Sequence, residues 1–518
     1  MRILTCGDRA ILVEVDDLPA VLALAATARA ADLPGVLDVV PAARTVLLVT
    51  APGTDLGALR RAVLALPVDQ AEGAPEGETV EIDVSYDGPD LDEVGHLTGL
   101  GRDGVIAAHT GTSWRVAFGG FAPGFAYLTG GDPRLGVARR HEPRISVPAG
   151  SVGLAGEFSG VYPRASPGGW QLIGRTGVAL WAPERGALLR PGDQVRFTRG
   201  SAARERRTGP EHRRPRTGAL EVVATGPQAL VEDVGRPGLA ATGVGRSGAA
   251  DRAALRLANR LVANPEDAAG VEVLFGGLVV RARRHLTVAL AGAPAPADVD
   301  GRPMGHHSVI TLRPGQLLTL GPPPSGLRTY LAVRGGIDVD TVSGSRATDV
   351  LSGVGPAPLA AGDVLPTGPE PSTFPLVDVA PVALPPAGTV TLRAVLGPRA
   401  DRFVDPAALA RTTWTASERS DRVGMCLRGE PLRRHDRAEL PSEGMVRGAI
   451  QVPPVGEPVL FLADHPVTGG YPVVAVVLDA DVDRAAQVRP GQGVRFRLVD
   501  LPGSGSGVSE NRGAIPRS

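Results

Sequence analysis

Two stretches of the sequence place a pair of glycines before an aromatic residue and a short strand-like run. The first is SPGGWQLIGRT at 166–176, and the second is TGGYPVVAV at 468–476. Paired glycines cost backbone entropy, so a chain keeps them where it needs an unusual backbone angle or a close approach. The question for both stretches is whether another strand or a small molecule makes that approach.

The first stretch follows HEPR at 141–144, roughly one hairpin upstream. The forked guanidinium of arginine binds a carboxylate through two parallel hydrogen bonds, and backbone N–H groups of a Gly-Gly turn can donate to a carbonyl oxygen. The pattern predicts a pocket with His141 as a catalytic acid or base. Its predicted substrate-binding residues are Arg144, Ser166, Gly168, Gly169, Arg175 and Thr176. In the alternative interpretation both arginines pair with nearby carboxylates and His141 is merely exposed.

The second stretch lies within ADHPVTGGYP at 463–472. Neighbouring residues face opposite ways on a strand, whereas on a loop Asp464 and His465 can both reach a substrate. Histidine titrates near neutral pH and is suited to act as a general base. We predict catalytic roles for Asp464, His465 and Glu443, and substrate contacts from Thr468, Gly469 and Gly470.

Several serine–arginine turns in the second half are typical of anion binding. EDVGR (232–236) and GRSGAADR (245–252) precede a helical apolar stripe at 250–264, and N–H groups at the start of a helix attract anions. The predicted nucleotide- or anion-binding residues are Arg236, Ser247, Gly248, Ser345, Arg346 and Arg422. Helix capping by Ser247 or Asp251 is the alternative.

The composition excludes other chemistry. All 54 basic residues are arginine, so the chain has no Walker-A lysine, no lysine Schiff base and no site for biotin attachment. Cys6 and Cys426 form no metal motif, and the adjacent His306 and His307 lack ligand spacing and are interpreted as surface residues, so no metal is predicted. A net charge of −1 argues against nucleic-acid binding.

The sparse cysteines and the lack of a signal peptide or a long apolar run predict a cytoplasmic protein that does not associate with membranes. The 68 glycines and 48 prolines, with few aromatic residues, favour short strands joined by turns.

The elements that must position these residues form several modules. Residues 1–78 alternate strand and helix patterns, as in a small α/β domain, and 79–200 are mostly short strands. A basic linker at 201–218 leads to strand-rich modules at 219–385 and 386–500 and to a tail at 501–518 predicted to be disordered. RPGDQVRF (190–197) and RPGQGVRF (489–496) agree at six of eight positions, which predicts related β-barrels.

Longer motifs resemble known families. FGGFAPGFAYLTG (118–130) and RISVPAGSVGLAGEFSGVYPRASPGGWQLIGRT (144–176) resemble the allophanate hydrolase subunit 1 family, which includes the B subunit of 5-oxoprolinase. VEDVGRPGLAATGVGRSGAADRAALRLANRLV (231–262), SEGMVRGAIQVPP (442–454) and ADHPVTGGYPVVA (463–475) resemble the subunit 2 family, which includes the C subunit. The resemblance covers nearly the whole chain, in the order B then C.

The resemblance implies a mainly β fold with minor α/β content, in which tandem cyclophilin-like β-barrels follow the small α/β domain. It implies a component of ATP-dependent 5-oxoprolinase, which converts 5-oxo-L-proline to L-glutamate using ATP with Mg and requires the separate A subunit of that enzyme. One alternative is the carboxyltransferase component of a urea carboxylase or allophanate hydrolase-like system, with biotin carried on another chain. Another is a regulatory binding protein of the kinase-inhibitor type. The resemblance does not indicate which half binds ATP or whether the chain forms a homo-oligomer.

Overall fold

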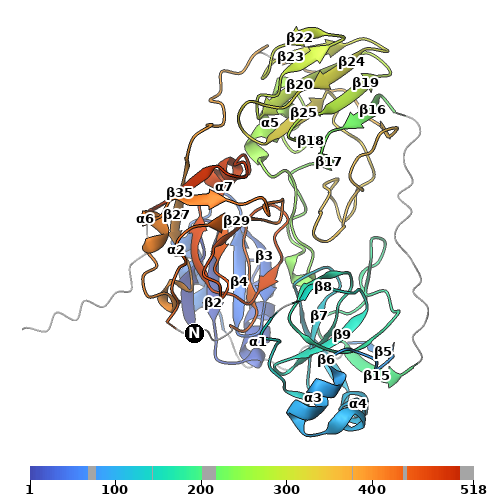
Figure 1. Ribbon diagram of the computed structural model, residues 1–518, viewed down its shortest axis with the longest axis vertical. Coiled ribbons are helices and arrows are strands. Elements are labelled where there is room, and N and C mark those ends of the chain that lie inside the picture. Colours follow the sequence, from blue (N-terminus) through green and yellow to red (C-terminus); the bar gives the residue numbers. More distant parts are fainter. Residues whose placement is uncertain (68–76, 143, 201–217, 376, 436–439, 502–518) are drawn as a thin grey trace, which may run out of the picture.

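The computed structural model describes residues 1–67, 77–142, 144–200, 218–375, 377–435 and 440–501. The fold is mainly β, with barrel-like modules and a small α/β domain, as the sequence predicts. Figure 1 shows the sheets of 219–365 at one end of the molecule and the strands of 79–200 at the other. The N-terminal domain and the C-terminal strands lie together beside them. The predicted linker and tail fall almost wholly outside the described residues.

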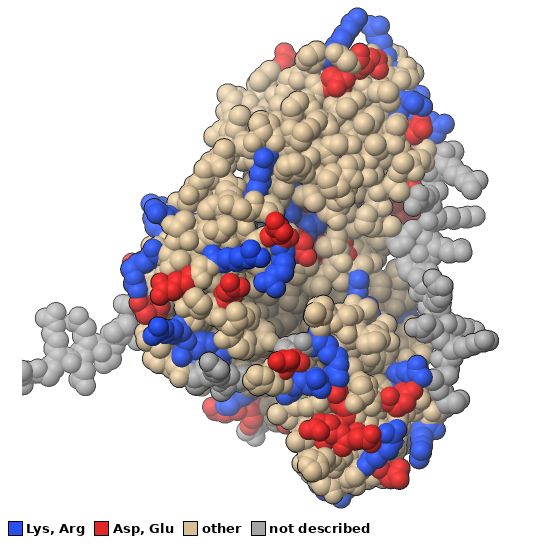
Figure 2. All heavy atoms as spheres, in the orientation of Figure 1, with Lys and Arg blue, Asp and Glu red and all other residues tan. Residues whose placement is uncertain are grey.

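Charged side chains of both signs are mixed on the surface. On the face shown in Figure 2, basic and acidic groups lie beside one another, and neither sign forms an extended patch. This distribution agrees with the net charge of −1. The face therefore offers no continuous basic surface of the kind that binds nucleic acids.

The N-terminal domain is a four-stranded sheet in the order β1-β2-β4-β3. Its elements are β1 (Arg2–Thr5), β2 (Ala10–Glu14), α1 (Leu18–Ala30), β3 (Val36–Pro41), β4 (Thr45–Thr50) and α2 (Leu56–Leu64). Alternate residues of a strand face opposite sides of a sheet. Ile11 and Leu48 therefore pack under the helices, whereas Leu12 and Leu47 pack against the C-terminal barrel. The sheet is buried on both faces, and one of these faces packs against the C-terminal barrel.

The second module is a seven-stranded sheet that curls into a nearly closed barrel, in the order β12-β9-β10-β7-β6-β15-β5. Its two edges meet where Ser85 and Arg175 exchange backbone hydrogen bonds of 2.8 and 2.9 Å. Its elements are β5 (Thr79–Val84), α3 (Leu91–Thr98), α4 (Gly101–Gly111), β6 (Trp114–Gly119), β7 (Ala126–Thr129), β8 (Arg144–Val147), β9 (Ser151–Ala155), β10 (Phe158–Val161), β11 (Ser166–Gly168), β12 (Gln171–Arg175), β13 (Trp181–Ala182), β14 (Gly186–Ala187) and β15 (Gln194–Arg199).

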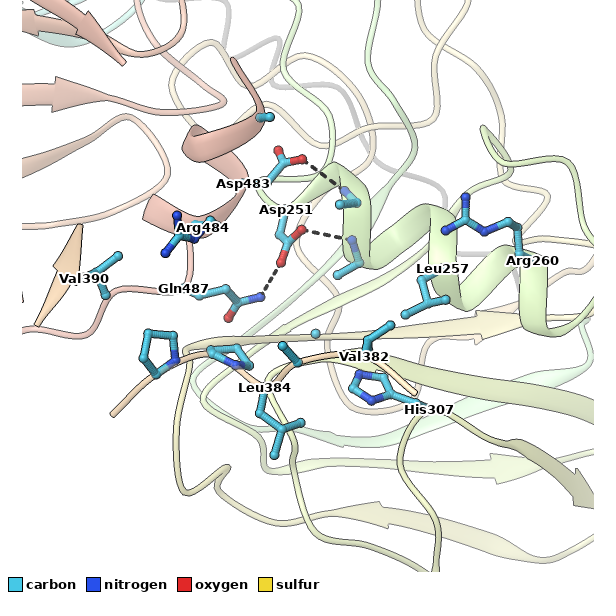
Figure 3. Close-up of a pocket in the computed structure, with 17 residues that line it drawn as sticks. Asp251, Leu257, Arg260, His307, Val382, Leu384, Val390, Asp483, Arg484 and Gln487 are labelled. Carbon is cyan, nitrogen blue, oxygen red and sulfur yellow. Dashed lines mark hydrogen bonds between the residues drawn. The ribbon is translucent and has the colours of Figure 1, made fainter. Parts of the chain in front are cut away.

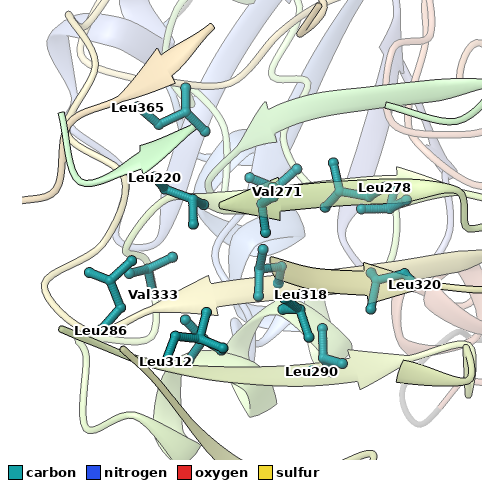
Figure 4. Close-up of a cluster of buried hydrophobic side chains, with 14 of the residues drawn as sticks. Leu220, Val271, Leu278, Leu286, Leu290, Leu312, Leu318, Leu320, Val333 and Leu365 are labelled. Carbon is teal, nitrogen blue, oxygen red and sulfur yellow. The ribbon is translucent and has the colours of Figure 1, made fainter. Parts of the chain in front are cut away.

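The third module places a six-stranded sheet over a five-stranded sheet, in the orders β22-β21-β24-β19-β16-β26 and β17-β18-β25-β20-β23. Aliphatic side chains from both sheets, such as Leu220, Leu318, Val271 and Leu290, fill the space between them (Figure 4). Its elements are β16 (Leu220–Thr225), β17 (Gln228–Glu232), α5 (Arg252–Leu261), β18 (Gly270–Leu274), β19 (Leu278–Ala282), β20 (Leu286–Gly292), β21 (Ala297–Val299), β22 (Arg302–Met304), β23 (Val309–Leu312), β24 (Leu317–Leu320), β25 (Arg328–Val333) and β26 (Val364–Leu365).

The last module is a closed barrel in the order β27-β34-β31-β32-β29-β28-β35, with a separate pair β30-β33. Its elements are β27 (Val390–Leu396), α6 (Ala408–Arg411), β28 (Trp414–Ala416), β29 (Gly424–Arg428), β30 (Glu443–Gly444), β31 (Ala449–Gln451), β32 (Val459–Phe461), β33 (Thr468–Gly469), β34 (Val473–Val477), α7 (Asp479–Ala485) and β35 (Gly493–Leu498). None of the helices in the described part of the chain has the length and apolarity needed to cross a membrane.

Candidate functional site

In the first half, the arginines near the first glycine pair are bound to aspartates. Arg144 Nη2 donates to Asp90 Oδ1 at 2.7 Å, and Arg140 Nη1 donates to the same oxygen at 2.8 Å. Asp90 is 3% exposed, and its second oxygen accepts from the backbone N–H of Leu172 at 2.7 Å. These bonds tie β8 and β12 to the start of α3, so Arg144 serves the barrel frame.

The other first-half candidates lie in two places on the barrel, beside the paired strands β8 and β11 and at the end of β12. His141 is exposed. Arg175 pairs with Asp87 at 2.7 Å on the surface, and the backbone N–H of Thr176 donates to the carbonyl of Gly150 at 2.8 Å. The Ser166 hydroxyl is buried and has no hydrogen-bond partner among the described residues. The pairing of β8 with β11 sets Gly168 opposite Arg144, whereas Arg175 ends β12. The predicted substrate contacts of these residues stay predictions.

The glycine pairs themselves have a packing role. A Cβ on Gly168 would collide with the Tyr162 hydroxyl group, and a Cβ on Gly469 would lie 2.8 Å from Gln451 Nε2. A Cβ on Gly470 would meet the guanidinium of Arg139, which belongs to the first half. Both pairs therefore allow close approach of a neighbouring protein side chain.

The second glycine pair lies where the two halves of the chain meet. Thr468 Oγ1 accepts the backbone N–H of Phe121, in the FGGF motif, at 2.8 Å. Ser442 Oγ lies 3.1 Å from the Tyr127 hydroxyl and accepts from Arg139 Nη2 at 3.0 Å. Motifs more than 300 residues apart in the sequence therefore contact each other directly.

Glu443, predicted to be catalytic, is buried in an ion pair. Arg399 Nε donates to Glu443 Oε1 at 2.9 Å, and Arg399 Nη2 also reaches Glu14 of the N-terminal domain at 2.8 Å. Burial raises the pKa of Glu443 above its usual value, and the guanidinium opposes that shift. The contact of Arg399 with Glu14 links the N-terminal domain to the C-terminal barrel.

Four of the predicted second-half residues form one buried network centred on Arg422. Its guanidinium donates to Asp464 at 2.9 Å, to Glu272 at 2.6 Å and to the carbonyl of Gly248 at 2.7 Å. The Ser247 hydroxyl donates to Asp464 at 2.6 Å. The network joins the module at 219–365 to the C-terminal barrel, and these members pair with one another.

Three further anion-binding candidates lie near that network. Ser345 Oγ and the N–H of Arg346 donate to the two oxygens of Asp233, each at 2.7 Å. Arg236 is 2% exposed and donates to the carbonyl of Ala347. The predicted contacts of these residues with a nucleotide stay predictions.

His465 lines a cavity of about 90 Å³ where the N-terminal domain, the loop before α5 and the C-terminal barrel converge. We call it the junction cavity. It has a basic lining formed by Arg9, Arg246, Arg252 and Arg447, with Asp479, and an apolar part that includes Val40, Met445 and Val467. Its volume is enough for a small anion or several water molecules.

Three of the four arginines share one carboxylate. Asp479, the first residue of α7, lies 2.8 Å from Arg9, 2.5 Å from Arg252 and 3.3 Å from Arg447. Against the opposing effect of burial, these cations lower the pKa of Asp479 to about 2. The carboxylate is therefore fully ionised at neutral pH.

Arg246 is the exception among the four. Its Nε donates to the carbonyl of Val234 at 3.3 Å, and no carboxylate of the described residues lies within ion-pair distance of it. Burial and the neighbouring Arg252 lower the pKa of Arg246 to about 10. The junction cavity therefore holds a cation that remains charged at neutral pH and has no direct ion-pair partner among the described residues, although Asp479 of the same lining acts on it from a distance.

His465 has a defined tautomer. Its Nδ1 lies 2.9 Å from the carbonyl of Pro466, which only accepts, so Nδ1 carries the proton. Burial lowers the pKa of His465, which keeps the ring neutral. Its Nε2 is then a free base, which is the state needed for accepting a proton from a bound molecule.

Both halves of the chain match family models. Residues 1–189 match the carboxyltransferase domain, subdomain C and D, and residues 242–498 match the carboxyltransferase domain, subdomain A and B. The C subunit of 5-oxoprolinase from Escherichia coli K12 is 36% identical over 287 residues, which is 54% of this chain and 92% of that protein. The chain belongs to the carboxyltransferase-domain family.

Other members of the carboxyltransferase-domain family match each half or the whole chain. The B subunit of 5-oxoprolinase from Escherichia coli O157:H7 is 44% identical over 177 residues, 33% of this chain and 80% of that protein. The crystal structure of TTHA0988 matches with a TM-score of 0.83 at 36% identity and covers 94% of this chain and 100% of that one. Chains that combine both halves in this architecture therefore exist as single proteins.

A third group of relatives has a different name. Urea amidolyase of Saccharomyces cerevisiae is 31% identical over 303 residues, which is 54% of this chain but only 16% of that protein. The match therefore relates about half of the present carboxyltransferase-domain chain to a small part of a much longer protein.

Sequence reasoning missed the basic lining of the junction cavity. Arg246 lies in GRSG and Arg447 lies in MVRG, both within motifs noted in the sequence. The functional roles were predicted for the nearby Ser247 and Glu443 and not for these two arginines. Arg9 lies in a short turn with no motif around it. Its convergence with the others depends on how the N-terminal sheet packs, which no local pattern reports. None of the described residues form a metal-binding cluster.

Proposed function

We propose that this chain is the fused B and C component of an ATP-dependent 5-oxoprolinase, which acts on 5-oxo-L-proline together with the separate A subunit of that enzyme and MgATP. The observation that carries the proposal is the junction cavity. It is lined by residues from both halves, and each half is similar to a different 5-oxoprolinase subunit. A substrate bound there would need both halves.

The chemistry of the cavity suits a small molecule with one carboxylate. Arg246 supplies a guanidinium without a direct ion pair among the described residues, and a guanidinium binds carboxylates through charge-assisted hydrogen bonds. His465 Nε2 supplies a neutral base. Arg9, Arg252 and Arg447 are held by Asp479 and keep the surrounding potential positive. In this assignment Arg246 binds the 5-oxoproline carboxylate, and His465 acts as the base that accepts a proton at the lactam.

Opening an unstrained lactam needs activation, which phosphorylation of the amide oxygen by ATP provides by making the carbon more electrophilic and creating a leaving group. The chain has no lysine to hold phosphates in a Walker-A loop. We therefore assign a part of ATP binding to the A subunit. The purified chain alone is expected to release no glutamate from 5-oxoproline, and glutamate and ADP should form when the A subunit and MgATP are added.

The decisive experiment compares two arginine variants in that reconstituted assay. Arg246→Gln should reduce kcat/KM about tenfold to a hundredfold, since one charge-assisted contact with the substrate is lost. Arg313→Gln, on an exposed turn of the third module, is the control and should leave the rate unchanged. Equal rates for both variants would show that the junction cavity is not the substrate site.

A carboxyltransferase role is the second candidate, because the matching family models carry that description and a urea amidolyase is among the relatives. In that role the chain would transfer carboxylate between a biotin carrier on another protein and an amide-containing acceptor. Carboxylation of urea by this chain with a separately supplied biotinylated carrier, and no glutamate release with the A subunit, would favour it.

A further inference from the structure

A second cavity, of about 470 Å³, lies between α5, α7 and the segment 382–390 (Figure 3). We call it the helix cavity. It is separated from the junction cavity by the start of α5 and by α7. Asp483 lines the helix cavity, and its Oδ1 accepts from Arg447, which lines the junction cavity, at 2.6 Å. A volume of this size lies within the range of small-molecule sites.

One side of the helix cavity is apolar. Leu257 projects from α5, and Val382 and Leu384 belong to the segment that connects the third module to the last barrel. Figure 3 shows this segment running below the helix. Val382 is 42% exposed and Leu384 is 54% exposed, so these side chains offer unburied apolar surface to a ligand.

The polar end of the helix cavity holds a buried carboxylate without a cation. Asp251 caps α5 by accepting from the N–H of Ala254 at 2.9 Å, and it also accepts from Gln487 Nε2 at 2.8 Å. No arginine of the described residues lies within ion-pair distance of it. Burial and the nearby Asp483 raise the pKa of Asp251 to about 7. Arg447 acts on Asp251 from a distance and opposes this rise, but Asp251 has no direct cationic partner among the described residues.

The other charged groups of the lining already have partners. Asp483 is paired with Arg447, as described above. Arg260 pairs with Glu266 at 2.9 Å, and Arg484 lies 3.8 Å from Asp481. Both arginine side chains are more than half exposed, which weakens their field at Asp251.

His307 provides an independent sign of a ligand. It was predicted to be a surface residue, but it is 6% exposed and lines the helix cavity, so that prediction is wrong. Its ring makes no hydrogen bond among the described residues, and burial lowers its pKa, which keeps it neutral. Its φ of +56° is in the left-handed region, where residues other than glycine are strained. The ring nitrogens of His307 are therefore available as hydrogen-bond partners for a molecule in the helix cavity.

We propose that the helix cavity binds a small organic cation, with its ammonium group at Asp251 and its apolar body against Leu257, Val382 and Leu384. The ammonium group compensates the buried carboxylate, and His307 accepts a second hydrogen bond from the ligand. This site is separate from the proposed 5-oxoproline site. It does not depend on which reaction the protein performs.

The test uses three probes of similar shape and different charge: cyclohexylammonium, cyclohexanol and cyclohexanecarboxylate. Each is titrated into the purified full chain at about pH 7.5 by isothermal calorimetry, where the Asp251 carboxyl is largely ionised. Cyclohexylammonium should bind at least about tenfold more tightly than either of the other two. Tightest binding by cyclohexanecarboxylate would overturn the proposal, because it would mean that Arg260 or Arg484 dominates the site. Binding by none of the three would also overturn it.

Two variants then locate the bound cation. Asp251→Asn keeps a side-chain oxygen for the helix cap and should weaken cyclohexylammonium binding about tenfold to a hundredfold. Asp267→Asn, on the exposed surface beyond α5, is the matched control and should have no effect. Leu257→Trp should abolish binding by filling the cavity, without removing the carboxylate. Unchanged binding in Asp251→Asn, or in Leu257→Trp with a native melting temperature, would refute the assignment.

Discussion

In the barrel at 79–200, β15 lies parallel to β5 and antiparallel to β6; in the barrel at 386–500, β35 lies parallel to β27 and antiparallel to β28. In each barrel a tryptophan indole donates to a carbonyl five residues earlier, from Trp114 to His109 at 3.1 Å and from Trp414 to Leu409 at 3.0 Å. These shared contacts establish that the repeated sequence motifs mark a repeated framework.

The two barrels differ at the residue that accepts the indole hydrogen bond. His109 is fully buried and bridges the Tyr86 hydroxyl at 2.7 Å and the Ser159 hydroxyl at 2.9 Å. Its counterpart Leu409 packs in an apolar core. The first barrel therefore has hydrogen-bonded polar side chains in its core. The second has its buried charged side chains, Arg422 and Asp464, at the interface with the third module. A shared framework thus tolerates either location for buried polar groups, provided that each group is paired.

The largest expected effect is at Arg422. Arg422→Met would leave Glu232 and Asp464 buried without their cation, while Glu272 would keep Arg328 at 3.3 Å. Removing one partner of a buried ion pair costs about 3–5 kcal/mol. The corresponding change in the first barrel, Arg144→Met, removes a partly exposed partner of Asp90, which keeps Arg140, and should cost about 1 kcal/mol or less. Urea denaturation of both variants measures the difference. Equal losses would contradict the contrast between the barrels.

The next effect is at His109. His109→Leu copies the second barrel but leaves the Tyr86 and Ser159 hydroxyls buried and unpaired, which should cost about 1–3 kcal/mol. The triple variant His109→Leu, Tyr86→Phe, Ser159→Ala removes all three polar groups and should recover much of that loss. Chemical denaturation of the single and triple variants tests this. If the triple variant is less stable than the single one, unpaired hydroxyls are not the cause.

His109 also predicts a pH dependence. Burial lowers its pKa from the ordinary value of 6.5 to about 3, so the unfolded chain binds a proton that the folded chain excludes between these values. This histidine's contribution to stability is therefore complete above about pH 6.5 and is lost as the pH falls toward 3. The free energy of unfolding of the wild type should fall more steeply with acidification than that of the triple variant. Parallel pH profiles would rule out this contribution.

A smaller effect is expected at the repeated Arg-Pro-Gly turn. Asp193 accepts the N–H of Arg190 at 2.7 Å, and its counterpart Gln492 accepts the N–H of Arg489 at 3.0 Å. Gln492 also donates to the carbonyl of Pro386 at 2.8 Å. Alanine at either position should cost about 1 kcal/mol, as for a single hydrogen-bonded turn residue. Thermal unfolding of Asp193→Ala and Gln492→Ala under the same conditions measures whether the two turns contribute equally to stability.

The smallest stability effect is expected at Arg175. Its backbone closes the first barrel through Ser85, and alanine preserves those bonds, while its side chain is 62% exposed in the pair with Asp87. Arg175→Ala should change stability by less than about 1 kcal/mol. Because Arg175 does not line the junction cavity, the proposed substrate site predicts unchanged activity in the presence of the A subunit. The substrate contact predicted from the sequence would instead reduce that activity about tenfold to a hundredfold. Wild-type activity would place Arg175 outside the substrate site, and a large fall in melting temperature would make it a structural residue.

Local patterns in the sequence were enough to establish the class of fold and the internal repeat. Strand-like alternation, turn residues and the two Arg-Pro-Gly octets are local signals, because they reflect the period of a strand and the backbone angles of a turn. The first two helices could also be predicted from local signals, since the side chains of Asp17 and Asp55 cap the starts of α1 and α2. The family was accessible for the same reason, as its motifs are continuous in the chain.

The grouping of those residues into sites depended on tertiary packing. Arg144 and Arg422 both stand near turns in the sequence, yet one braces a barrel through Asp90 and the other joins two modules. Arg246 became a candidate only because folding brings Arg9, from the N-terminal domain, to the same cavity and leaves Arg246 without a direct ion pair among the described residues. Charge compensation depends on distances in space between residues far apart in sequence, and no local pattern encodes them.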